Sequence, residues 1–213
     1  MDSMIQYGFE QFCKFVLRKY CRLHTNQIDI PPGPFIICSN HASHLDTPAL
    51  MLALQKPFGE FRMLAAKDHF QRDPKKKTFS QHILNLILVD RSANPLETRR
   101  LIKECEHAKS MKKNIIIYPE GTRSLDAKMQ PFKSGSIYLA QKLNLPIIPA
   151  AITGTGDALG KTRWFIRPKK ISVRFGEPIL PERFSGPVQK ATLQQLTQEL
   201  EQSIRDLLAQ GKT

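Results

Sequence analysis

A histidine and an aspartate five positions apart in one polar stretch, His41 and Asp46, could act together on a proton. An imidazole can accept a proton at neutral pH because the usual histidine pKa is ~6.5. A carboxylate against its other ring nitrogen would fix the tautomer and stabilise the imidazolium that forms. The pair therefore suits general-base activation of a hydroxyl group. Taken alone, each residue has a structural reading too: a hydrogen-bonded turn histidine, and an aspartate that caps a helix.

Two further polar clusters follow apolar runs. Asp90-Arg91 comes after Ile83–Val89, and Glu120-Gly121-Thr122-Arg123 comes after Asn114–Tyr118. A single arginine would be an ordinary surface residue, but two arginines after neighbouring strand ends predict a phosphate site, because the guanidinium group binds phosphate through paired hydrogen bonds. No serine or cysteine lies in a nucleophile motif such as G-x-S-x-G. This favours direct attack by a substrate hydroxyl over a covalent enzyme intermediate.

A metal site can be drawn from the same stretch, with His44 joining His41 and Asp46. Two histidines three residues apart in a turn, with one carboxylate, are a thin ligand set for zinc. We therefore expect no metal ion and treat His44 as a neighbour of the pair.

The elements that must position these residues alternate between short strands and helices. Phe35–Cys38 is a β-branched apolar run after a proline-rich stretch, and Asp46-Thr47-Pro48 predicts a helix start with Asp46 as its cap. Further strands are expected at Phe61–Ala66, within Ile83–Val89, and at Asn114–Tyr118, Pro146–Ile152 and Ile171–Phe175, and further helices at about 94–110, 134–143 and 191–209. This order predicts one α/β domain with a mainly parallel or mixed central sheet flanked by helices. Polar residues at the strand ends would then meet in one cleft. Pro149 predicts a bulge or an edge strand.

An amphipathic helix is predicted near the N-terminus. Its apolar side chains recur at helical spacing, with lysines and arginines between them: Ile5, Phe9, Phe12, Val16, Tyr20 and Leu23. Such a helix either packs on the domain core or lies in an anionic membrane surface, and both hold if one edge stays exposed. We divide the chain into this helix, residues 1–24, and a domain formed by residues 25–213.

The charge of the chain favours an anionic partner. Its 213 residues include 32 Lys and Arg against 19 Asp and Glu, a formal net charge of +13. Nucleic acid, phosphorylated metabolites and an acidic membrane surface all suit this charge. The basic stretch Arg72–Lys77 reads as a solvated loop or as a phosphate or headgroup contact. No helix-turn-helix, zinc-finger or RNP-like pattern is present, so we expect no nucleic-acid partner.

Cysteine usage and hydropathy predict the location. The four cysteines form no C-x-x-C pair, as in a reduced cytoplasmic protein. No apolar segment approaches the ~20 residues of a membrane span, and the first residues do not read as a secretory signal. We therefore expect a cytoplasmic protein that associates peripherally with the inner face of the membrane and has no transmembrane span.

Four blocks in fixed order resemble the glycerophospholipid acyltransferase family. They are His41-x4-Asp46, Val89-Asp90-Arg91, Pro119–Ser124 with Phe132-Lys133-x-Gly135, and Leu145–Pro149. Any one block would be weak evidence, whereas four in order within residues 30–180 are specific.

The resemblance implies a reaction and a role for each matching residue. His41 would be the general base on a glycerol hydroxyl, and Asp46 would orient it. The acceptor's phosphate site would be formed by Arg91, Glu120, Gly121, Thr122 and Arg123, with Lys67 as a further basic position and Lys133 as a weaker candidate. An acyl thioester, acyl-CoA or acyl carrier protein, would be co-substrate, with no cofactor.

The implied reaction is acyl transfer to the sn-2 hydroxyl of 1-acyl-glycerol-3-phosphate, giving phosphatidic acid. Another lysophospholipid or glycerol 3-phosphate are alternative acceptors. Two different classes also remain: a basic nucleic-acid-binding domain, and a lipid-binding domain without catalysis.

Overall fold

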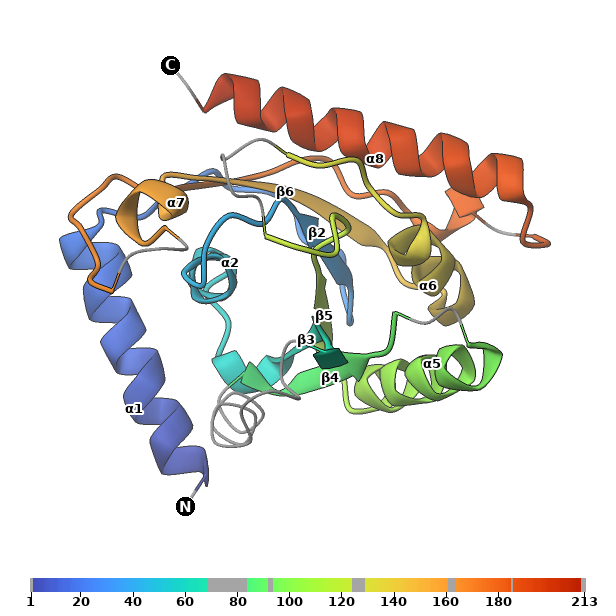
Figure 1. Ribbon diagram of the computed structural model, residues 1–213, viewed down its shortest axis with the longest axis horizontal. Coiled ribbons are helices and arrows are strands. Elements are labelled where there is room, and N and C mark those ends of the chain that lie inside the picture. The colour runs from blue at the N-terminus through green and yellow to red at the C-terminus, as the bar shows by residue number, and fades with distance from the viewer. Residues whose placement is uncertain are drawn as a thin grey trace.

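A mixed seven-stranded sheet forms the centre of the molecule, with strand order β1-β7-β6-β2-β5-β3-β4 (Figure 1). The computed structural model describes residues 2–68, 84–91, 94–123, 129–160, 164–184 and 186–211. The basic stretch Arg72–Lys77 and Ser124 lie outside the described residues. The strands are β1 (His24–Thr25), β2 (Ile36–Ser39), β3 (Phe61–Ala66), β4 (Leu86–Val89), β5 (Asn114–Ile117), β6 (Ile147–Thr153) and β7 (Ser172–Phe175). The pairing is parallel between all neighbours except β6 and β7, which confirms the predicted α/β architecture.

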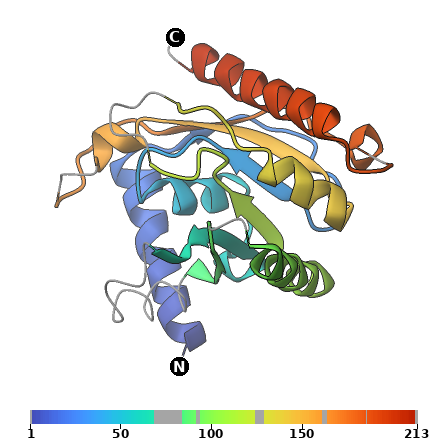
Figure 2. The same ribbon diagram turned by 45° about the vertical axis from the view of Figure 1, so that its right-hand side comes forward.

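Helices cover both faces of this sheet. They are α1 (Asp2–Lys14), which continues as a π-helix over Phe15–Tyr20, α2 (Asp46–Ala53), α5 (Pro95–Ser110), α6 (Gly135–Leu143), α7 (Thr155–Ala158) and α8 (Lys190–Gln210), with 3₁₀ turns at Phe58–Glu60 and Pro181–Phe184. Figures 1 and 2 show α1 and α2 on one side of the sheet and α5, α6 and α8 on the other.

The β2 segment shows why a strand between two helical layers is apolar throughout. Phe35 and Ile37 pack into the cluster under α1 and α2, whereas Ile36 and Cys38 pack into the cluster under α5, α6 and α8. Successive side chains point to opposite faces, so both faces need apolar residues. All four residues are fully buried.

Pro149 lies in an interior strand, so of the two predicted alternatives the edge strand is excluded and the bulge remains. β6 pairs with β2 on one side and with β7 on the other. The carbonyl of Pro149 accepts a hydrogen bond from Gly176 on the β7 side, so its missing N–H faces that side too. On that side Ala150 pairs with Phe175, and the next pair is Ile147 with Ile179. The segment after β7 therefore has one residue more than β6 between these two pairs, opposite the proline. The irregularity expected of a proline therefore falls on the neighbouring segment.

The N-terminal helix is present, but its predicted apolar face is only partly right. Cys13, Val16, Leu17 and Cys21 are buried in the core under α1 and α2. Phe12 is 57% exposed, and Ile5 and Tyr20 are exposed as well. The π-helix over Phe15–Tyr20 turns less per residue than an α-helix, so a face drawn with α-helical spacing drifts off the buried side. The helix packs on the core with one side and keeps an aromatic edge exposed.

Candidate active site

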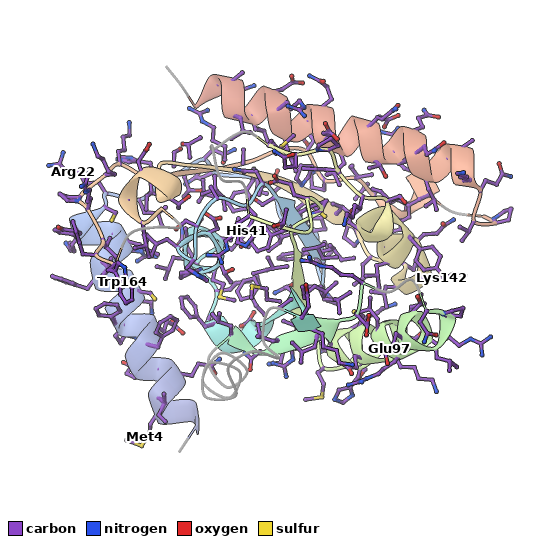
Figure 3. All side chains as sticks on the ribbon, in the orientation of Figure 1. Met4, Arg22, His41, Glu97, Lys142 and Trp164 are labelled. Carbon is purple, nitrogen blue, oxygen red and sulfur yellow. The ribbon has the colours of Figure 1, made fainter. Side chains whose placement is uncertain are left out.

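The polar clusters meet at one edge of the sheet. β2, β5, β3 and β4 are neighbours and run parallel, so their carboxyl ends lie side by side. The residues that follow these ends line a pocket of about 890 Å³, among them His41, Arg91, Gly121, Thr122 and Arg123. Figure 3 shows His41 at the centre of the molecule. Lys67 and Glu120 are not among the lining residues.

His41 and Asp46 form a hydrogen-bonded pair in the turn between β2 and α2. The imidazole Nδ1 lies 2.8 Å from Asp46 Oδ2. Asp46 is fully buried, while His41 stays partly exposed to the pocket. With Nδ1–H donating to the carboxylate, the lone pair of a neutral imidazole is on Nε2. The arrangement supplies a base whose tautomer is fixed by a buried anion.

Asp46 is not the helix cap that the sequence suggested. The cap position is Leu45, and Asp46 is the first residue of α2. Its Oδ2 instead turns back to accept the N–H groups of Ala42 and Ser43, at 2.7 and 2.8 Å. These bonds close the turn between β2 and α2, which we call the His41 turn, around the carboxylate and aim the carboxylate at the imidazole of His41.

Asn40 anchors the same turn to the sheet. Its Oδ1 accepts from Ile152 N at 2.8 Å, and its Nδ2 donates to Ile152 O at 2.9 Å. The side chain thereby extends the pairing between β2 and β6 by one position. The backbone directly before His41 is held in register with the strand beside it.

Tyr118 contacts His41 in a way that the sequence did not reveal. The two rings are stacked, with centroids 3.9 Å apart and an interplanar angle of 11°. The Tyr118 hydroxyl lies 2.8 Å from Thr47 Oγ1, which fixes the phenol from its far end. The only signal in the sequence is an aromatic residue at the end of the strand next to β2, directly before Pro119. The imidazole is thus held on one edge by Asp46 and on one face by Tyr118.

Glu120 joins two loops rather than facing the pocket. It is almost fully buried. Its Oε1 accepts from His41 N at 2.7 Å and its Oε2 from Gln130 N at 2.8 Å. Burial raises the pKa of Glu120, although both backbone N–H groups and the nearby His41 oppose that rise. The carboxylate links the backbone of the His41 turn to the loop that leads into α6.

Each of the two arginines has partners of its own: a histidine for Arg123, and for Arg91 a backbone carbonyl and the carboxylate of Asp68, whose Oδ2 lies 3.7 Å from Arg91 Nη1. Arg123 Nη1 lies 2.6 Å from His44 Nε2, and Arg91 Nη2 donates to the Gly121 carbonyl. His44 therefore contacts a predicted phosphate ligand. Burial lowers the pKa of Arg123, with the charge of Asp46 opposing the shift, but a guanidinium group stays protonated in proteins. Both positive charges line the pocket.

Two lysines near the arginines take different positions. Lys133 lines the pocket, and its Nζ would lie 3.3 Å from a Cβ added at Gly121, where φ is +71°. A side chain at this glycine would therefore be strained and would press on the lysine. Lys67 forms an ion pair with Asp90, with Nζ 3.8 Å from Oδ2.

The sequence matches the family model described as Acyltransferase over residues 22–153, more than half of the chain. The chain belongs to the acyltransferase family. The matched range includes His41 and Asp46, both arginines and Glu120.

Two curated relatives from different organisms carry the same name. The 1-acyl-sn-glycerol-3-phosphate acyltransferase of Limnanthes douglasii is 36% identical over 148 residues, 68% of this chain and 50% of that protein. The protein of the same name from Saccharomyces cerevisiae is 29% identical over 154 residues, 71% of this chain and 49% of that protein. The chain thus spans about half the length of these curated relatives.

A solved structure extends the likeness to the fold. The crystal structure of the 1-acyl-sn-glycerophosphate (LPA) acyltransferase from Thermotoga maritima matches with a TM-score of 0.68 at 25% identity, over 98% of this chain and 81% of that one. Among the described residues, none of the helices combines the length and the hydropathy that crossing a bilayer requires.

Proposed function

We propose that this acyltransferase moves a fatty acyl group from an acyl thioester to the sn-2 hydroxyl of 1-acyl-glycerol-3-phosphate, giving phosphatidic acid. The observation that carries the proposal is the His41–Asp46 pair in a pocket that also holds two arginines. A base beside fixed positive charges suits a substrate with both a hydroxyl and a phosphate. The names of the similar proteins support the same acceptor.

The reaction follows from the pair. His41 Nε2 takes the hydroxyl proton as the acceptor oxygen attacks the thioester carbonyl carbon. Asp46 stabilises the imidazolium that forms. The tetrahedral intermediate collapses, the carbon–sulfur bond breaks, and the imidazolium returns its proton to the thiolate. The hydroxyl oxygen has then gained the acyl group, the donor leaves as a thiol, and the enzyme is unchanged.

The acceptor's phosphate would bind between Arg91 and Arg123, with Lys133 close by. All three cations line the pocket, and the backbone of Gly121 and Thr122 lies in the same wall. Glu120 repels a phosphate by its charge when it is ionised, so we assign it the shaping of this wall through its two backbone N–H groups. We assign Lys67 an indirect role through Asp90.

The acyl chains would occupy the apolar part of the same pocket. Its walls include Met63 and Leu64 of β3 and Leu101 and Ile102 of α5. A pocket of this size that combines apolar walls with a few converging polar groups suits an amphiphilic ligand. This apolar side lies next to the cations, as an acceptor with one phosphate and one acyl chain requires.

We also propose that the enzyme associates peripherally with an anionic membrane on its cytoplasmic face. Phe15 is 65% exposed on the N-terminal helix, and Trp164 and Phe165 are 98% and 62% exposed. The Trp164 segment lies beside that helix (Figure 3), because Tyr20 Oη donates to Ile166 O at 3.4 Å. Exposed cations surround the aromatic residues, namely Arg18, Lys19, Arg22, Arg167, Lys169 and Lys170. Aromatic and basic residues together are typical of an interfacial surface.

The central test is His41→Ala in a thiol-release assay with an acyl thioester and 1-acyl-glycerol-3-phosphate. Loss of the general base should lower kcat by ~10²–10⁴-fold. His24→Ala is the matched control, because His24 is exposed on β1, away from the lining residues. Thermal melts of both variants separate lost chemistry from lost folding.

A panel of acceptors tests the substrate. The phosphorylated lysolipid should be acylated, whereas monoacylglycerol without a phosphate should have a much higher KM. Full turnover by a folded His41→Ala protein would refute the mechanism. Preference for glycerol 3-phosphate or another lysophospholipid would keep the mechanism and change the acceptor.

A further inference from the structure

A second groove lies on the other side of α5 from the active pocket. It has a volume of about 800 Å³ and is formed between α5 and the start of strands β3 and β4. Its basic residues are Arg62, Arg99, Arg100, Lys103 and His107, and its apolar residues include Leu86 and Leu96. We call this feature the α5 groove. Figure 1 shows α5 at the outer edge of the molecule, beside β4.

Three cations of the α5 groove have no partner among the residues that the structure describes. Within the described part of the chain, the side chains of Arg62, Arg99 and Lys103 form no hydrogen bond or ion pair. Arg100 is different, because its Nε lies 3.0 Å from Glu104 Oε1. The groove therefore holds more positive charge than its single pair neutralises.

Among these cations, Arg62 gives the strongest indication of an anionic ligand. It is half-buried at the start of β3, and burial alone lowers the pKa of its guanidinium group. A buried charge is ordinarily paired, because desolvation is costly without compensation. An anionic group that enters the groove would meet Arg62 and relieve this cost.

Leu96 adds an apolar contact beside the cations. It is 71% exposed in the first turn of α5. Asn94 caps this helix by accepting from Leu96 N at 2.9 Å, and Pro95 follows the cap, so the residue sits on a rigid support. Cations around one protruding leucine fit the face of an acidic amphipathic helix better than they fit a small inorganic anion.

The position of the groove relates it to the active pocket. Thr98, Leu101 and Ile102 lie on the opposite side of α5 and line that pocket. The two sites are therefore separated by about the diameter of a helix, ~10 Å. A thioester on a long flexible prosthetic arm could pass the start of α5 and reach His41 while its carrier stays on the α5 groove.

We propose that the α5 groove is the docking surface for an acidic carrier protein that delivers the acyl thioester. This inference rests on the proposed acyl transfer and names its donor partner. Carboxylates of the carrier pair with Arg99 and Lys103, one enters the groove at Arg62, and Leu96 packs on the carrier's apolar side. Free acyl-CoA bypasses this surface because it has no acidic helix to dock.

The test compares two donors in steady-state assays, an acyl thioester of a holo acyl carrier protein and the same acyl group on coenzyme A. Arg62→Gln and Lys103→Glu should each raise KM for the carrier-protein donor by about tenfold, with a steep dependence on salt. The same variants should leave kcat and KM for acyl-CoA unchanged. Lys190→Glu, an exposed charge reversal at the start of α8, is the matched control and should change neither donor.

Each contrary outcome overturns the docking proposal and leaves the reaction testable. An unchanged KM for the carrier-protein donor in both variants refutes it. Equal KM increases for both donors also refute it, because they indicate damage to the active pocket. If the variants lose binding to anionic vesicles and keep the carrier-protein KM, the groove binds lipid instead. Turnover of acyl-CoA by the unaltered enzyme supports acyl transfer in all these cases, and only its absence counts against that function.

Discussion

The imidazole of His41 is restrained in two directions, by Asp46 on its edge and by Tyr118 on its face. Asp46 fixes the tautomer of the imidazole and balances the charge of its protonated form, while the stacked phenol of Tyr118 limits rotation of the imidazole ring. Burial, and after it the charge of Asp46, raises the pKa of Tyr118 well above its ordinary value. The hydroxyl therefore stays protonated at neutral pH and does not compete with His41 as a base.

Replacement of Tyr118 should separate positioning from binding. Tyr118→Leu removes the stacked ring, so we expect kcat to fall about tenfold through misplacement of the base, with KM for the acceptor nearly unchanged. Tyr118→Phe keeps the ring and should restore most of kcat. Steady-state kinetics on both variants, with melting curves, measure this. A fall in kcat of equal size in the two variants would assign the effect to the hydroxyl group instead.

At the level of single residues, the sequence was informative where the partners are close in the chain. The spacing of His41 and Asp46 suggested their contact, and the ordered blocks downstream favoured it over the separate structural roles of a turn histidine and a helix cap. The stack with Tyr118 joins residues that follow two different strands, and its geometry depends on β2 lying beside β5. Glu120 was expected at the phosphate site, but whether a carboxylate faces a pocket or a buried backbone depends on the packed loops around it.

At the level of elements, α8 holds the loop that leads into α6. Glu201 Oε2 accepts from Phe132 N at 2.9 Å, and its Oε1 lies 2.7 Å from Arg205 Nη2. Burial opposes ionisation of this carboxyl, but the Phe132 N–H and Arg205 outweigh burial and lower the pKa of Glu201 below 4.5. Because the folded pKa is depressed, its contribution to stability is present above pH 4.5 and is lost as the pH falls through the folded value.

Glu201→Gln should therefore destabilise the protein in a pH-dependent way. We expect the free energy of unfolding to fall by about 1 kcal/mol near neutral pH. The difference from the unaltered protein should shrink as the pH falls from 4.5 through the lower pKa of the folded state, because only below that pKa is Glu201 neutral in both states. Urea unfolding at neutral and acidic pH measures it. Glu199→Gln, a substitution on the same helix that removes an ion pair with Arg183, is the control, and a pH-independent loss for Glu201→Gln would contradict this expectation.

The order of elements was predictable because local signals mark their ends. Asn94-Pro95 starts α5 as expected, with the Asn94 side chain as its cap. Two departures from the predicted elements have non-local causes. The irregularity opposite Pro149 belongs to β7 and the residues after it, and the π-helical turn that shifts the buried side of the N-terminal helix depends on its packing against the core.

At the level of the whole molecule, the excess positive charge is distributed over several surfaces. Part of it lies in the active pocket, part in the α5 groove, and part around the exposed aromatic residues near Trp164. Net charge alone could not separate these surfaces, because the sequence gives a sum and the fold gives its distribution. For the same reason, the net charge of +13 is compatible with a nucleic-acid partner when only the composition is known.

The aromatic surface predicts membrane binding that depends on apolar contact. Trp164→Ala with Phe165→Ala should reduce flotation with anionic vesicles by about tenfold or more, since burying each large side chain is worth ~1.5–3 kcal/mol. Leu180→Ala, which removes an exposed apolar residue elsewhere, should have little effect. Undiminished flotation of the double variant would exclude this segment from the membrane surface. Turnover of a water-soluble short-chain acceptor should be unaffected.

The hydrogen bonds between Asn40 and Ile152 make one backbone amide a reporter of the opening of the His41 turn. The N–H of Ile152 donates to the side chain of Asn40, which directly precedes His41. Its proton can therefore exchange with solvent only when this hydrogen bond breaks. The exchange rate of that single amide therefore measures how often the turn opens, with no substrate present. A slow rate would mean that the base is kept in place between reaction cycles, and a fast rate would mean that the turn is completed only when the acceptor arrives.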